Sequence, residues 1–154
     1  MTYFFAYGDR MNTDRMAEFA PDARVVGPAR LRGYRLLFNV RSRTWGGGAA
    51  NAVIDPAGFL WGVLWDLGEV DPTKLETSRD EDEPPQPVEV TVDGPDGPIA
   101  AQTMAIFSGE RFVRPSERYV AMLRAQAEQQ GLPQEALDAI DEAAEGLYGQ
   151  APTI

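Results

Sequence analysis

The segment from Phe59 to Trp65, Phe-Leu-Trp-Gly-Val-Leu-Trp, carries no polar side chain at any position. Successive side chains of a β-strand point to opposite faces of the sheet, so an unbroken apolar run of this length predicts a strand that is covered on both faces. Such a strand belongs in the middle of a sheet rather than at its edge. The fold therefore has to place other elements on both sides of this segment.

Strand patterns dominate the first two-thirds of the chain. Short aromatic and β-branched runs bounded by turn residues are typical of strands, and five further runs of this kind occur, at Thr2–Tyr7, Leu31–Val40, Ala49–Ile54, Val88–Val92 and Ile99–Phe107. The last two are expected to form a hairpin through the turn region Asp93–Pro98. Asp55–Gly58 has the composition of a turn and is expected to separate two strands.

Within Leu31–Val40 the alternation assigns side chains to two faces. One face is expected to carry Leu31, Gly33 and Arg35, and the other Tyr34, Leu36 and Phe38.

Helix signals lie mainly near the end of the chain. Asn12 is a suitable N-cap for a short helix over Thr13–Phe19, and Asp71-Pro72 is expected to begin another that reaches Thr77. Two longer helices are expected after these, the first beginning at Pro115-Ser116 and ending at Gly131, the second beginning at Leu132-Pro133. Their inward faces are expected to carry Tyr119, Met122 and Leu123 in the first helix and Leu137, Ile140, Ala144 and Leu147 in the second.

Strands first and helices last is the order of an α+β protein with a curved or closed sheet. A length of 154 residues without a linker-like segment predicts a single domain over residues 1–154.

The chain contains no histidine and no cysteine. Catalysis by a His base or a Cys nucleophile is therefore excluded, as is a metal site with His or Cys ligands, and we expect no metal. A formal net charge of −10 argues against nucleic acid or an anionic membrane as partner. The start of the chain has no signal-peptide pattern, and we expect a cytoplasmic protein. Monomer and homodimer both stay open.

Two glycine-bearing loops follow or precede predicted strands, Tyr7-Gly8-Asp9-Arg10 and Gly46-Gly47-Gly48. Loops of this kind expose backbone N–H groups that can bind a carboxylate or a phosphate. Tight turns without a ligand would give the same pattern, and neither loop matches a known nucleotide-binding motif.

Six segments in order resemble the γ-glutamylcyclotransferases, namely Tyr3–Gly8, Gly27–Phe38, Trp45–Ala50, Trp61–Trp65, Pro115–Tyr119 and Gly131–Pro133. The resemblance implies a small closed mixed β-barrel of about six strands with flanking helices. It also implies a small-molecule substrate and a cofactor-free reaction in which the α-amine of a γ-glutamyl group attacks its own γ-carbonyl and releases 5-oxoproline. Because the attack is intramolecular, positioning supplies much of the rate, and a carboxylate suits the proton transfer.

The chain departs from the family pattern at two places that bear on chemistry. The family binds the substrate α-carboxylate on a Tyr-Gly-Ser-Asn turn, whereas this chain has Asp9 and Arg10 after Tyr7-Gly8. The family draws its base from a Glu-Gly pair, whereas this chain has Arg79-Asp80 there. In place of the family residues, we expect Tyr7, Gly8, Arg10, Arg79 and Tyr119 to bind the substrate, and either Asp9 or Glu81 to take over the proton transfer.

Several alternatives stay open for these residues. Asp9 is either the relocated base, the acceptor of an amine-bearing ligand, or one half of a structural ion pair with Arg10. Glu81 lies in an acidic run that is equally typical of a solvated loop, and Tyr119 is either a pocket residue or a core residue of its helix. The whole chain is either a cyclotransferase, the same fold adapted to a different cyclisation or amine chemistry in biosynthesis, or a binding module without activity.

Overall fold

The computed structural model describes residues 2–72, 85–107 and 111–146. Its strands are β1 (Tyr3–Ala6), β2 (Arg24–Ser42), β3 (Gly47–Asp66), β4 (Gln86–Gly94) and β5 (Gly97–Ala105). Its helices are the 3-10 helix η1 (Asp9–Met11) and the α-helices α1 (Thr13–Phe19), α2 (Glu117–Gln129) and α3 (Gln134–Ala144). The helix expected over Asp71–Thr77 falls largely on residues outside the described part.

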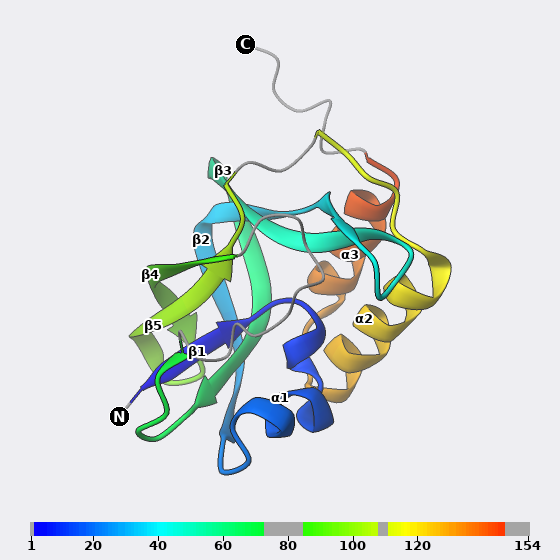
Figure 1. The fold of residues 1–154 in the computed structure, drawn as a ribbon. Coiled ribbons are helices and arrows are strands. Elements are labelled where there is room, and N and C mark those ends of the chain that lie inside the picture. The colour runs from blue at the N-terminus through cyan, green and yellow to red at the C-terminus, as the bar shows by residue number, and fades with distance from the viewer. Residues whose placement is uncertain (1, 73–84, 108–110, 147–154) are drawn as a thin grey trace.

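The five strands close into a barrel in the order β1-β3-β2-β4-β5. Neighbouring strands are antiparallel except for β1 and β5, which meet in parallel at Phe4 and Gln102 and make the barrel mixed. The α+β class and the closed mixed barrel with flanking helices are confirmed. In Figure 1, α2 and α3 lie side by side along one side of the barrel, with α1 at the barrel end nearest β1.

The barrel has one strand fewer than the sequence predicts, because Ala49–Ile54 and Phe59–Trp65 form a single strand, β3. Residues 55–58 bulge opposite Gly33, since Arg32 pairs with Phe59 and Tyr34 with Ile54. The Asp55 carboxylate accepts the N–H of Ala57 at 3.1 Å, as in a turn, yet the chain does not reverse there. The turn composition therefore marks a bulge rather than a strand end.

The same bulge corrects the predicted faces of β2. Gly33 has φ +87°, a left-handed conformation that shifts the alternation of the side chains by one position. Leu31 and Leu36, which strict alternation puts on opposite faces, are therefore both buried in the core together with Phe38.

The other elements agree with their sequence signals. Asn12 caps α1 by accepting the N–H groups of Asp14 and Arg15 at 2.8 and 3.2 Å, and β4 and β5 form the expected hairpin. The central position of Phe59–Trp65 is confirmed, because β3 pairs with β1 on one side and β2 on the other. The predicted cover on both faces does not hold at Phe59, which is 40% exposed. No helix in the described ranges is long and apolar enough to cross a membrane.

The barrel and the two long helices share one core. The buried faces of the helices consist of Tyr119, Leu123 and Ala127 in α2 and Ala136, Leu137, Ile140 and Ala143 in α3. Met122 and Ala144 pack at the edge of this core rather than within it, and Leu147 lies outside the described residues.

Candidate functional site

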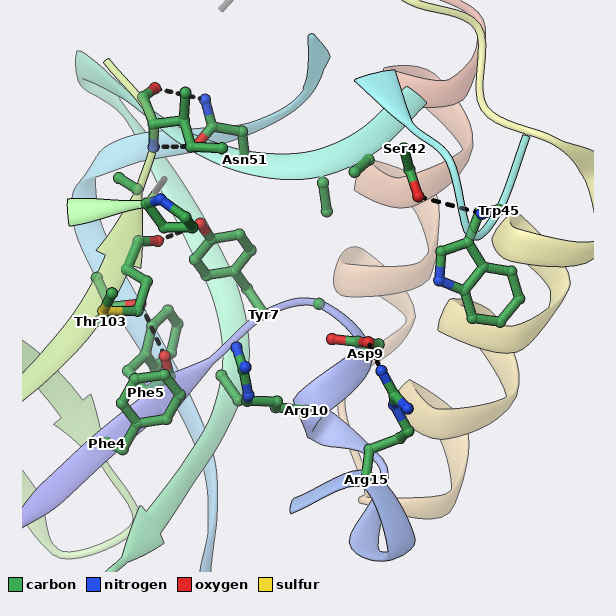
Figure 2. A pocket seen from close by; sticks show the side chains of 18 of the residues that line it. Phe4, Phe5, Tyr7, Asp9, Arg10, Arg15, Ser42, Trp45, Asn51 and Thr103 are labelled. Atoms are coloured by element: carbon green, nitrogen blue, oxygen red, sulfur yellow. Dashed lines mark hydrogen bonds and ion pairs between the residues drawn. The ribbon is translucent and has the colours of Figure 1, made fainter. Parts of the chain in front are cut away.

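A cavity of about 140 Å³ opens where β1 ends. One wall comes from η1 and α1, and the opposite wall from the segment that carries Ser42 and Trp45 (Figure 2). Tyr119 of α2 lines the cavity beside Trp45. Its floor consists of barrel residues that include Phe4, Phe5 and Thr103. The cavity thus joins segments that are far apart in the sequence.

The turn Tyr7–Arg10 leads from β1 directly into this wall. The Gly8 carbonyl accepts the N–H of Met11 and the Asp9 carbonyl accepts the N–H of Asn12, both at 3.0 Å. The Tyr7 hydroxyl donates a hydrogen bond to the carbonyl of Met104 on β5. The turn is therefore fixed to the barrel at one end and to the cap of α1 at the other.

Asp9 pairs with an arginine that the sequence analysis did not single out. Its carboxylate lies 3.0 Å from the Arg15 guanidinium, and 29% of the Asp9 side chain is exposed. The Arg10 guanidinium instead lies over the ring of Phe19, 4.3 Å from its centroid, which is a cation–π distance. Asp9 thus forms its ion pair with Arg15, and the Asp9–Arg10 pair considered as one alternative is not the one formed.

The glycine loop approaches a backbone segment of the same chain. A Cβ atom on Gly48 would lie 1.9 Å from the carbonyl oxygen of Val113, and the Gly48 N–H donates to the Arg114 carbonyl at 2.9 Å. Gly46 has φ +72°, which a residue with a side chain rarely adopts. The glycines therefore let residues 46–48 pack on the segment before α2, and this packing places Trp45 at the cavity.

Tyr119 is both a core residue and a cavity residue. Only 4% of it is exposed, and its hydroxyl accepts the N–H of Ala50 on β3 at 2.9 Å. Its ring lies 5.0 Å from that of Trp45, whose ring in turn lies 4.7 Å from the Arg118 guanidinium. Arg118 also donates a hydrogen bond to the Thr44 carbonyl at 2.7 Å. Tyr119 and Arg118 of α2 thus both contact the segment that carries Trp45.

We expect Tyr119→Phe to destabilise the protein, because it leaves the Ala50 N–H without its acceptor. The free energy of unfolding should fall by about 1 kcal/mol, measured by chemical denaturation. The control is Tyr34→Phe, which removes the hydroxyl of a half-buried tyrosine away from the cavity. Equal stability of the two variants would contradict a role for the Tyr119 hydroxyl.

Of the predicted site residues, Tyr7, Gly8, Asp9, Arg10 and Tyr119 line this cavity. Arg79 and Glu81 lie outside the described residues, although Pro85, which closely follows them in the chain, lines the cavity. The roles assigned to all seven stay predictions.

Sequence reasoning missed five polar residues that line the cavity, Arg15, Ser42, Thr44, Asn51 and Thr103. Asn51 is 1% exposed, and its amide exchanges hydrogen bonds with both backbone groups of Ile106, at 2.8 and 2.9 Å. A lone amide inside an apolar strand was the signal that could have identified Asn51. No group of acidic residues in the described part of the chain is arranged to hold a metal ion.

No family model matches the chain. It is 29% identical over 137 residues to a protein named gamma-glutamylcyclotransferase from Bos taurus, an alignment that covers 86% of this chain and 73% of the relative. A relative of the same name from Homo sapiens is 29% identical over 150 residues, covering 90% of this chain and 78% of the relative. The structure superposes on that of a protein named gamma-glutamyl cyclotransferase with a TM-score of 0.77.

The chain resembles the γ-glutamylcyclotransferases in sequence and in fold. The superposition covers 91% of this chain and 86% of the solved γ-glutamylcyclotransferase, at 25% identity. The likeness therefore extends over most of the chain, and the resemblance inferred from sequence motifs is confirmed.

Proposed function

We propose that the protein is a γ-glutamylcyclotransferase-like enzyme that releases 5-oxoproline from a γ-glutamyl amide or γ-glutamyl amine. The observation that carries the proposal is the cavity between the Tyr7–Arg10 turn and Tyr119, in a chain similar over most of its length to proteins named for this reaction. The family resemblance points to the same two segments for substrate binding.

The reaction forms one bond and breaks one. The α-amine nitrogen bonds to the γ-carbonyl carbon, and the bond from that carbon to the leaving nitrogen breaks. The α-ammonium loses one proton before the attack and a second when the ring has closed, and the leaving nitrogen takes up two protons when it departs as an ammonium. A site for this reaction needs a group that accepts and returns protons, and a cavity that folds the substrate onto itself.

Asp9 is the carboxylate best placed to transfer these protons, because no other Asp or Glu in the described part of the chain lines the cavity. Its ion pair with Arg15 engages one oxygen, Oδ2. The second oxygen then accepts a proton from the substrate nitrogen. Tyr7, Gly8 and Arg10 surround the substrate from the side of the turn, and Trp45 and Tyr119 from the opposite wall.

The test is incubation of the purified protein with a panel of γ-glutamyl amino acids and γ-glutamyl amines, followed by quantification of 5-oxoproline. We expect 5-oxoproline from at least one member of the panel above the rate of spontaneous cyclisation. Absence of 5-oxoproline from every member would overturn the cyclotransferase proposal.

A second function, a different cyclisation or amine chemistry at the same cavity, is favoured by one observation. Asp9 and its partner Arg15 are charged side chains in the turn wall, where the family pattern has an uncharged serine in the place of Asp9. Release of a cyclic product other than 5-oxoproline from a γ-glutamyl amine of the panel would support this second function. The open cavity lined by Asp9, Arg10 and Tyr119 argues against a binding module whose former site is filled.

A further inference from the structure

Three charged side chains are found among the described residues that line the cavity, Asp9, Arg10 and Arg15. Two are cations and one is an anion. Asp9 alone would repel a ligand that carries a carboxylate, because like charges in a partly desolvated site raise each other's energy. What the cavity accepts therefore depends on how the charge of Asp9 is compensated.

Arg15 provides this compensation directly. Its guanidinium contacts Asp9 Oδ2 at 3.0 Å through one nitrogen and Glu18 Oε2 at 3.1 Å through the other. The Glu18 side chain is 57% exposed and does not line the cavity, so water screens its charge more than that of Asp9, which is 29% exposed. In the cavity, the main partner of Arg15 is thus Asp9.

The local structure holds the pair in place. Asn12 accepts the N–H groups of Asp14 and Arg15, so the first turn of α1, which carries Arg15, has a fixed position relative to the turn that carries Asp9. Figure 2 shows the two side chains meeting at the cavity wall formed by η1 and α1. The contact of Arg10 with the ring of Phe19 keeps the second guanidinium on the same wall.

We propose that Arg15 is a specificity-determining residue, which neutralises Asp9 and so lets the cavity accept a ligand that carries a carboxylate. The inference rests on the proposed function for its ligand class, because a γ-glutamyl group and 5-oxoproline both carry an α-carboxylate. In the family pattern, an uncharged turn binds the α-carboxylate. In this chain, the Asp9–Arg15 ion pair would allow the carboxylate to bind.

The test measures binding rather than turnover. The probes are 5-oxoproline and its uncharged carboxamide, titrated by calorimetry, and the readout is the ratio of the two dissociation constants, which cancels general damage to the cavity. Arg15→Gln should reduce the preference for the carboxylate about tenfold or more. Arg15→Lys retains the charge and should retain most of the preference.

A double-mutant cycle separates charge compensation from a structural role. Asp9→Asn should increase the preference for the carboxylate, and Asp9→Asn with Arg15→Gln should return it to within about threefold of the unaltered protein. Arg124→Gln is the matched control. Arg124 forms an ion pair with Asp141 at a distance of 2.6 Å, and neither residue lines the cavity, so this variant should leave the preference for the carboxylate unchanged.

Three results would overturn the inference. They are an unchanged preference in Arg15→Gln, a double variant as impaired as Arg15→Gln alone, and no binding of 5-oxoproline to the unaltered protein. The 5-oxoproline assay on the γ-glutamyl panel is scored separately. Charge-dependent binding without turnover would refute the proposed function and support Arg15, whereas turnover without dependence on Arg15 would do the reverse.

Discussion

Replacing Asp9 by Asn is expected to reduce 5-oxoproline formation by about 10²- to 10⁴-fold, the range typical for loss of a general acid–base group. The amide has nearly the shape of the carboxylate but does not accept a proton at neutral pH. The measurement is the initial rate of 5-oxoproline release from the best substrate of the panel. Binding of the carboxylate-bearing product should not weaken, so the loss should appear in kcat rather than KM.

The control for this variant is Asp141→Asn. Asp141 pairs with Arg124 as Asp9 pairs with Arg15, but it lies on α3 away from the cavity. Its turnover should equal that of the unaltered protein, and thermal unfolding should show that Asp9→Asn is folded. Full activity of folded Asp9→Asn would refute Asp9 as the proton-transferring group and direct attention to Glu81.

Replacing Gly48 by Ala is expected to have the largest effect on stability. The added Cβ would lie 1.9 Å from the Val113 carbonyl oxygen, which is backbone and does not rotate away. Either β3 or the Val113–Ser116 segment has to move, and the hydrogen bond from the Gly48 N–H to Arg114 breaks. We expect a loss of about 3 kcal/mol or more in the free energy of unfolding.

For a chain of this size that loss corresponds to a decrease in Tm of about 6–12 °C, measurable by calorimetry. Gly94→Ala is the matched control, because the nearest atom to its Cβ is a side-chain methyl of Leu64 at 3.4 Å. A Gly48→Ala protein with the same Tm as the unaltered protein would show that the loop does not need the close approach of residue 48 to the Val113 carbonyl.

Local signals predicted the fold more successfully than the site. Three of these signals each depend on only a few neighbouring residues: the Asn12 cap, the start of a helix at Pro115-Ser116 and the apolar run at Phe59–Trp65. The structure has an N-cap at Asn12, an N-cap at Ser116 and a central strand at Phe59–Trp65. The bulge opposite Gly33 was missed because a four-residue turn composition looks the same whether or not the chain reverses.

The site was predictable only in part. The family resemblance identified the Tyr7–Arg10 turn and Tyr119, which meet at the cavity. The pairing of Asp9 with Arg15 could not be read from the sequence, because it depends on how η1 turns the chain before α1 begins. Arg10 was the nearer cation in sequence, and the ring of Phe19 contacts it instead.

The closure of the barrel has a consequence for how the cavity comes into existence. β1 pairs with β3 through residues such as Phe5 and Leu64, and it meets β5 through Phe4 and Gln102, almost a hundred residues along the chain. Contacts between such distant segments form late in folding, since the intervening chain has to be ordered first. The cavity is therefore assembled only in the complete fold. A ligand that binds in it should stabilise the whole barrel against unfolding.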